Sequence, residues 1–226
     1  MVNLRQTSET PQQQWQAEAF DSFLNMVKAA DGDFPAIDRL GKALYEPESF
    51  DLMINFLCGH QQGKQAFEKG LRLGTIDLPK LHQLPKETFG YQYADHLIRN
   101  GLTPLQAKSI ENRHQYLIAH LTETHDIWHV VTGSNTDIFG EMKLEAFYVA
   151  QLYASRFWLG LLTKNLLKAV VYDVELSSRY LDAITEGWIM ARKAEPLFGI
   201  EWDQLWEIPL VQIRKDLQID VVQNYK

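Results

Sequence analysis

The stretch that decides the fold is residues 137–162, which read DIFGEMKLEAFYVAQLYASRFWLGLL. Its apolar side chains recur at the three- and four-residue spacing that places them on one face of an α-helix. These positions are Met142, Ala146, Phe147, Ala150, Tyr153, Phe157 and Leu161. The pattern predicts one long helix from Asp137 to about Leu162, the longest in the chain.

Helical spacing and helix-start signals recur along the rest of the chain. Thr10 before Pro11 predicts a helix that ends at residues 31–33. The run Thr103-Pro104-Leu105-Gln106 predicts another start, because it combines an N-cap, a first-turn proline and a capping-box glutamine. Further helices are expected after Pro35 and over residues 50–57, 66–71, 88–100, 176–191 and 209–214. With no useful period-two alternation, the predicted fold is all-α, a multi-helix orthogonal bundle.

Length and composition fit one hydrophobic core. The chain has 226 residues, of which 46% are hydrophobic and 23% are charged, close to the usual globular balance. A chain of this size lies within the range in which one core still grows without splitting. The expected organisation is a single helical domain over residues 1–226, with residues 1–10 flexible.

Charge and cysteine content limit the function classes and the compartment. The formal net charge is -7 and no dense basic run occurs, which argues against a nucleic-acid partner. Cys58 is the only cysteine, so the chain forms no internal disulfide and fits a reducing compartment. The apolar region 146–172 is interrupted by Arg156, Lys164 and Lys168, too often for a membrane span. We expect a cytoplasmic protein that touches the inner face of a membrane without crossing it.

A candidate metal site lies in residues 125–141, which read HDIWHVVTGSNTDIFGE. On a helix, His125, Asp126 and His129 share one arc, because the histidines are one turn apart. Gly133 ends that helix, and the following loop returns Glu141 at the start of the next helix. Two imidazoles with carboxylates suit a divalent first-row ion such as zinc, iron or manganese. The sequence therefore predicts a metal site at the junction of two consecutive helices.

A structural interpretation competes with this one. Two histidines at i and i+4 also occur by chance, and Asp126 can serve the dipole at a helix N-terminus. Trp128, on the far side of the same helix, is expected in the core. His114 and His120 have no matching partner in the sequence, and we interpret them as surface or satisfied core residues.

Three motifs carry a resemblance to a known family. They are His125-Asp126-x-x-His129-x-x-x-Gly133 followed by Gly140-Glu141, then Leu84-Pro85-x-x-Thr88-x-Gly90-x-x-Tyr93-Ala94, and Pro209-x-x-x-x-Arg214-x-x-Leu217-x-Ile219. Together they resemble the ubiquinone (coenzyme Q) biosynthesis protein 4 family. The resemblance covers the chain from about Asp31 onward, and the first motif is long and specific.

The resemblance implies an α-helical protein that binds a divalent ion at His125, Asp126, His129 and Glu141. Zinc is the expected ion, with iron, manganese or magnesium as alternatives. The resemblance also implies that the protein handles polyprenylated quinone precursors or polyprenyl phosphates at a membrane surface. The family is described both as an organiser of other quinone-biosynthesis proteins and as the agent of oxidative decarboxylation of the ring. For catalysis, Asp126 and Glu141 are the candidate residues, since a carboxylate that is not a ligand can move a proton.

The apolar stripe beside the metal site is the candidate groove for the isoprenoid tail. Its candidate substrate-binding residues are Phe147, Tyr153, Phe157 and Leu161. The alternatives are that the stripe is plain core, or that it forms a homodimer interface. Three function classes follow: a metal-dependent enzyme, a lipid-binding organiser, and a phosphohydrolase of the His-Asp type. The last ranks lowest, because it needs a further upstream histidine and a distant aspartate.

Overall fold

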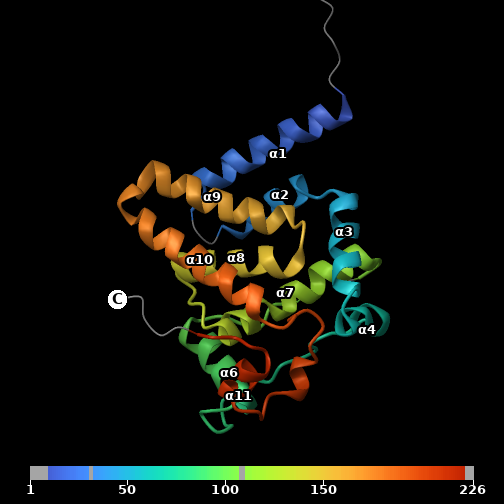
Figure 1. Ribbon diagram of the computed structural model, residues 1–226, viewed down its shortest axis with the longest axis vertical. Coiled ribbons are helices and arrows are strands. Elements are labelled where there is room, and N and C mark those ends of the chain that lie inside the picture. The colour runs from blue at the N-terminus through green and yellow to red at the C-terminus, as the bar shows by residue number, and fades with distance from the viewer. Residues whose placement is uncertain (1–9, 31–32, 107–109, 222–226) are drawn as a thin grey trace, which may run out of the picture.

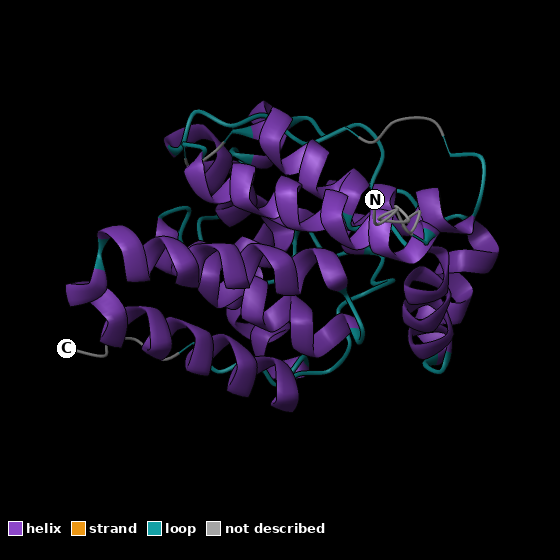
Figure 2. Ribbon diagram, turned by 90° about the horizontal axis from the view of Figure 1, so that it is seen from above, coloured by secondary structure: helices purple, strands orange, loops and turns teal. Residues whose placement is uncertain are grey.

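The computed structural model describes residues 10–30, 33–106 and 110–221. Within these ranges the chain forms eleven α-helices and two short 3-10 helices, with no strand (Figure 2). The predicted all-α fold is confirmed. The expected flexibility of the N-terminus concerns residues that, apart from Thr10, lie outside the described ranges.

The helices follow one another along the chain from α1 to α11 (Figure 1). They are α1 (Pro11–Lys28), α2 (Phe34–Ala43), α3 (Pro47–Cys58), α4 (Gln61–Lys69), α5 (Leu78–Leu81), α6 (Phe89–Arg99), α7 (Arg113–Thr132), α8 (Ile138–Leu152), α9 (Arg156–Tyr172), η1 (Val174–Leu176), α10 (Ser177–Lys193), η2 (Trp202–Gln204) and α11 (Leu210–Asp216).

Polar residues set the first turns of several helices. The Thr10 hydroxyl accepts a hydrogen bond from the Gln13 amide, and the Gln13 side chain accepts one from the Thr10 amide, which completes a capping box. The predicted start of the first helix is therefore confirmed. Thr88 caps α6 and Asp137 caps α8 in the same way, each accepting from a backbone N–H three residues later.

The expected helix start at Pro104 is wrong. Residues 102–106 have no regular structure, and α7 begins only at Arg113. The Asn112 side chain accepts from the Gln115 amide at 2.9 Å, while the Gln115 side chain accepts from the Glu111 amide at 2.7 Å. Asparagine is a stronger N-cap than threonine, and this reciprocal pair fixes the start of α7 there.

The predicted single helix over residues 137–162 is also wrong, because the chain breaks into α8 and α9. Tyr153 and Ala154 have positive φ angles of 55° and 53°, which no right-handed helix accommodates. The Ser49 hydroxyl donates to the Ala154 carbonyl at 2.9 Å, and Ser155 then caps α9. The apolar spacing continues across the break because each of the two helices buries a face of its own.

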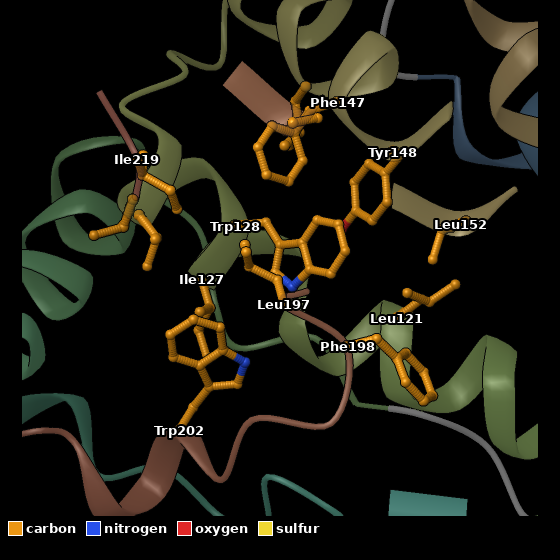
Figure 3. Packing of buried hydrophobic residues seen from close by; sticks show 14 of the residues in the cluster. Leu121, Ile127, Trp128, Phe147, Tyr148, Leu152, Leu197, Phe198, Trp202 and Ile219 are labelled. Atoms are coloured by element: carbon orange, nitrogen blue, oxygen red, sulfur yellow. The ribbon is translucent and has the colours of Figure 1, made fainter. Parts of the chain in front are cut away.

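The centre of the main core is the indole of Trp128 on α7. Tyr148 of α8 stacks on it with ring centroids 4.2 Å apart, and Phe147 meets it edge-on at 5.7 Å (Figure 3). Trp128, Phe147 and Tyr148 have no exposed surface. The core position expected for Trp128 is confirmed.

Helices α9 and α10 complete the packing around α8. On α10, Gly187 lies directly against the backbone of Lys143, so the two helices approach closely. On the other side, α1 and α2 lie along α9 (Figure 1) and bury Met26, Leu40 and Leu161 in a smaller cluster. Among the described residues, none of the helices has the length and apolar character needed to cross a membrane.

Two glycines in helix interiors give opposite expectations for stability. A Cβ at Gly187 would overlap the Lys143 carbonyl oxygen, whereas a Cβ at Gly41 would lie 3.5 Å from the Phe157 ring, an ordinary contact. Gly187→Ala should therefore lower the free energy of unfolding by about 1–3 kcal/mol. Gly41→Ala should raise it by up to about 1 kcal/mol, the gain in helix propensity. Chemical denaturation of both variants checks this pair, and equal effects would contradict the close contact of α8 and α10.

Candidate metal centre

Three of the four predicted ligand residues converge at the junction of α7 and α8. The Nε2 atoms of His125 and His129 are 3.3 Å apart, and Nε2 of His129 is 3.4 Å from Oε1 of Glu141. One ligand atom from each of these residues lies within 4.8 Å of the other two. The cluster therefore has the donor types and the spacing of a divalent-metal site.

The turn between α7 and α8 brings Glu141 beside His129. Gly133 ends α7 with a left-handed φ of 65°, a conformation that favours glycine. Asp137 then starts α8 by accepting from the Gly140 amide at 2.8 Å. A Cβ at Gly140 would overlap the carbonyl of Asn135, so a larger residue would push the start of α8 away.

The other ring nitrogen of each histidine contacts the surrounding protein. His129 Nδ1 lies 3.1 Å from the Ser134 carbonyl, which only accepts, so Nδ1 carries the proton and donates it. His125 Nδ1 lies 3.4 Å from the Tyr148 hydroxyl. Metal-binding histidines are held in this way, with Nε2 left free to face the ion.

The charges of His129 and Glu141 are coupled. Burial lowers the pKa of His129, but the hydrogen bond and the charge of Glu141 outweigh burial and leave that pKa raised. Burial likewise raises the pKa of Glu141, yet contact with His129 leaves it lowered. His125 differs, because burial and then the neighbouring His129 lower its pKa to about 4. His125 is therefore neutral and Glu141 ionised, as a divalent ion requires, whereas the raised pKa of His129 favours a proton that a bound ion would have to displace.

Asp126 lies near the cluster but outside it. Its carboxyl group is not among the ligand atoms that come within 4.8 Å of one another. The residue is 6% exposed, and burial raises its pKa to about 6, with His129 acting in the opposite direction. The sequence placed Asp126 on the same arc as the histidines, but the structure does not bring its oxygens into the group.

An aromatic stack that the sequence did not indicate supports the cluster. Tyr148 is stacked between Trp128 and Trp158, with its centroid 3.9 Å from that of Trp158. The His125 ring is nearly parallel to Tyr148 and Trp158, at 14° to each. One signal was available, because Tyr148 follows Glu141 by seven residues and so shares its face of α8.

The four predicted tail-binding residues do not share one face. Phe147 is fully buried against Trp128, while Phe157 and Leu161 belong to the cluster under α1 and α2. Tyr153 is 54% exposed and stacks on Phe56. The idea of one continuous stripe is therefore wrong, because it assumed a helix that breaks at residues 153 and 154.

Comparison with known proteins shows which family the chain belongs to. The family described as "Coenzyme Q (ubiquinone) biosynthesis protein Coq4" matches residues 5–223. The chain belongs to the Coq4 family. This confirms the resemblance seen in the three sequence motifs.

Curated Coq4 proteins resemble the chain at moderate identity. A homologue from Aedes aegypti is 27% identical over 168 residues, which are 71% of this chain and 60% of that protein. A homologue from Eremothecium gossypii is 29% identical, and the match covers 82% of this chain and 58% of that protein. A homologue from Rattus norvegicus is 28% identical, and the match covers 81% of this chain and 76% of that protein. The chain thus matches only about three fifths of the first two proteins. All three are named mitochondrial, and the cytoplasmic location expected here stays a prediction.

A solved structure shares the fold. A chain from Nostoc punctiforme PCC 73102, described as a candidate ubiquinone biosynthesis protein, superposes with a TM-score of 0.82. The match covers 91% of this Coq4-family chain and 98% of that chain, at 23% sequence identity. At this identity the likeness concerns the fold alone.

The histidines interpreted as structural have other partners. His120 is buried, with Nδ1 facing the Leu71 carbonyl and Nε2 accepting from the Gly199 amide. His114 bridges the Asp51 carboxylate and the Tyr45 hydroxyl nearer the surface. Both interpretations are confirmed.

Arg214 holds the end of the helix that carries both histidines. From α11, its Nε donates to the Val131 carbonyl at 2.9 Å and its Nη2 to the Val130 carbonyl at 2.8 Å. These carbonyls belong to the last turn of α7, where intrahelical donors are lacking. The closing motif of this Coq4-family chain therefore braces the turn that follows His129.

Replacing this guanidinium should weaken the brace measurably. A lysine at position 214 offers a single point donor instead of the planar fork, so Arg214→Lys should cost about 1–2 kcal/mol of unfolding free energy. The neighbouring Lys215 is exposed, and Lys215→Ala should stay within about 0.5 kcal/mol of the wild type. Denaturant titration measures both. Equal stabilities of the two variants would show that the carbonyls are satisfied equally well without the arginine.

Proposed function

We propose that this Coq4-family chain acts in ubiquinone biosynthesis by binding the polar head of a polyprenylated quinone precursor at a divalent ion. His125, His129 and Glu141 hold the ion. The observation that carries this proposal is the convergence of their three ligand atoms within 4.8 Å. Family membership supports the pathway, and the cluster supports the chemistry.

The donor set favours a first-row transition metal. Two imidazole nitrogens and one carboxylate suit zinc, with iron and manganese as alternatives, whereas magnesium prefers oxygen ligands throughout. Three protein ligands also leave coordination positions open, as in catalytic rather than structural zinc sites. We propose Asp126 as the nearby group that moves a proton.

Open coordination positions favour an enzyme over a lipid-binding organiser. When bound, the ion polarises an oxygen of the head group and orients the ring. The reaction that the family resemblance implies is oxidative decarboxylation, in which the ring carbon would lose its carboxylate as carbon dioxide and gain a hydroxyl, with dioxygen as the oxidant. Release of carbon dioxide from a prenylated hydroxybenzoate by the metal-loaded protein would support the enzyme. Tight binding without turnover would support the organiser.

Elemental analysis and metal titration test the ion. The wild type should bind one zinc or iron per chain, and His129→Ala or Glu141→Gln should lower the affinity at least about a hundredfold through loss of a ligand. Asp126→Asn should lower it less than about tenfold, since Asp126 lies outside the three-residue cluster. His114→Ala is the control, because His114 lies in the first turn of α7 and outside the cluster.

Two results would count against this assignment. A wild type that takes up no ion from excess zinc, iron or manganese would refute the metal site itself. Loss of the ion in Asp126→Asn as complete as in His129→Ala would make Asp126 a full ligand and would refute the three-ligand description.

We also propose that the isoprenoid tail follows the cluster between α9 and the pair α1 and α2. Trp158 supports this path, because its ring stacks near His125 at 5.9 Å and also packs beside Phe157 and Leu161. Head and tail sites would then be contiguous through Trp158. Phe147 and Tyr153 take no part in this path, one being core and the other lying at the helix break.

Affinity should therefore rise with tail length. Each buried methylene contributes about 0.8 kcal/mol before ordering costs, so a series of prenyl chains on one head should bind progressively more tightly. Phe157→Asp should weaken the binding of long prenyl tails and leave the binding of the ion unchanged. Leu159→Asp is the matched control, because Leu159 is exposed on the same helix. Equal binding of short and long tails, or equal behaviour of the two variants, would place the groove elsewhere.

Membrane contact has separate support at the far end of α9. Val170, Val171, Tyr172 and Val174 are exposed there in one short segment. Apolar side chains of this kind can enter the headgroup layer without crossing a bilayer. We propose this segment as the membrane-facing end of the molecule. Contact with other quinone-biosynthesis proteins and homodimer formation remain predictions from the sequence.

A further inference from the structure

Two buried polar atoms on α6 have no hydrogen-bond partner among the described residues. They are the hydroxyl oxygen of Tyr93 and Nε2 of His96. The two residues are three positions apart, so their side chains leave α6 on the same face. Buried polar atoms are nearly always paired, and two orphans on one helix face therefore call for an explanation.

This face of α6 meets the metal cluster. The His96 ring stacks on His129 with centroids 5.8 Å apart and an angle of 23° between the rings. Tyr93 is fully buried, and burial, followed by the charge of Asp126, raises the pKa of its hydroxyl. Asp126 and His129 are themselves three residues apart on α7. His96 thus lies beside His129, and Tyr93 leaves α6 on the same face, one turn earlier.

Core packing explains the Tyr93 ring but not its hydroxyl. The ring contacts Phe89 and Trp206, as a phenylalanine would. A buried hydroxyl without a partner is destabilising, so phenylalanine would serve the core better. His96 raises the same question, because its Nε2 is buried without a hydrogen-bond partner although the ring is large enough to fill the space as an apolar aromatic side chain would.

We propose that Tyr93 and His96 form the hydrogen-bonding wall of the metal site and position the oxygen atoms of an aromatic carboxylic acid bound to the ion. The Tyr93 hydroxyl and the His96 Nε2–H donate to carboxylate or phenol oxygens of that ligand. Both act as positioning residues rather than metal ligands, because His96 lies outside the three-residue candidate group and Tyr93 offers a neutral hydroxyl instead of an imidazole or carboxylate. The inference rests on the proposed function and assigns the substrate contacts of the same site.

Titration of the cobalt-loaded protein with 4-hydroxybenzoate tests the wall. The visible absorption of cobalt reports both ion binding and a change of its ligands, independently of any turnover. Tyr93→Phe and His96→Phe keep the aromatic rings and remove the donors. Each should retain one ion per chain and bind 4-hydroxybenzoate about tenfold more weakly, the loss of one hydrogen bond to a charged group. Tyr91→Phe on the same helix and His60→Phe on the surface are the controls and should match the wild type.

Thermal unfolding separates positioning from a structural role. Because the Tyr93 hydroxyl has no hydrogen-bond partner among the described residues, Tyr93→Phe should not lower the unfolding temperature, although it should weaken the binding of 4-hydroxybenzoate. The positioning role would be refuted if both variants bound 4-hydroxybenzoate as tightly as the wild type, or if the cobalt-loaded wild type did not bind it at all. Either result would leave the ion site itself intact. Loss of the ion in His96→Phe would overturn the positioning role by making His96 a ligand. A wild type without ion would refute the proposed function, and this inference with it.

Discussion

The turn from Gly133 to Gly140 is the constraint on which the rest of the structure depends. One glycine reverses the chain in a left-handed conformation, and the other lets the start of α8 touch the loop backbone. This geometry sets the register between α7 and α8. The same register that places Glu141 beside His129 also stacks Tyr148 on Trp128 two turns further on. The core and the candidate metal centre are therefore consequences of one turn.

Local patterns were sufficient for the fold class and for most of the ligand cluster. The two histidines follow from their i, i+4 spacing, and Glu141 follows from the glycine that ends α7. Asp126 shows the limit of this reasoning. Consecutive helical residues point about 100° apart, so the neighbour of His125 can miss a point that His125 reaches, even when both lie on one broad arc. Which groups it meets instead depends on tertiary packing, which the spacing of residues along one helix does not report.

The two wrong helix boundaries have a common physical origin. Hydrophobic spacing reports burial, and it continues unchanged through a break when the helices on both sides are buried, as at Tyr153. Possible N-cap residues compete for the start of a helix, and here the helix starts after Asn112 instead of after Thr103. The orphan atoms of Tyr93 and His96 left no local signal, because hydrogen-bond satisfaction becomes visible only when the helices are assembled.

The hydrogen bonds from Arg214 to the end of α7 also affect how the chain folds during synthesis. The arginine and the carbonyls it bonds are 83 and 84 residues apart in sequence. During synthesis, the turn after His129 must therefore emerge from the ribosome long before its brace exists. Contacts of such separation form late and slowly in folding. The nascent chain therefore exposes the junction of α7 and α8 without this brace until α11 has docked.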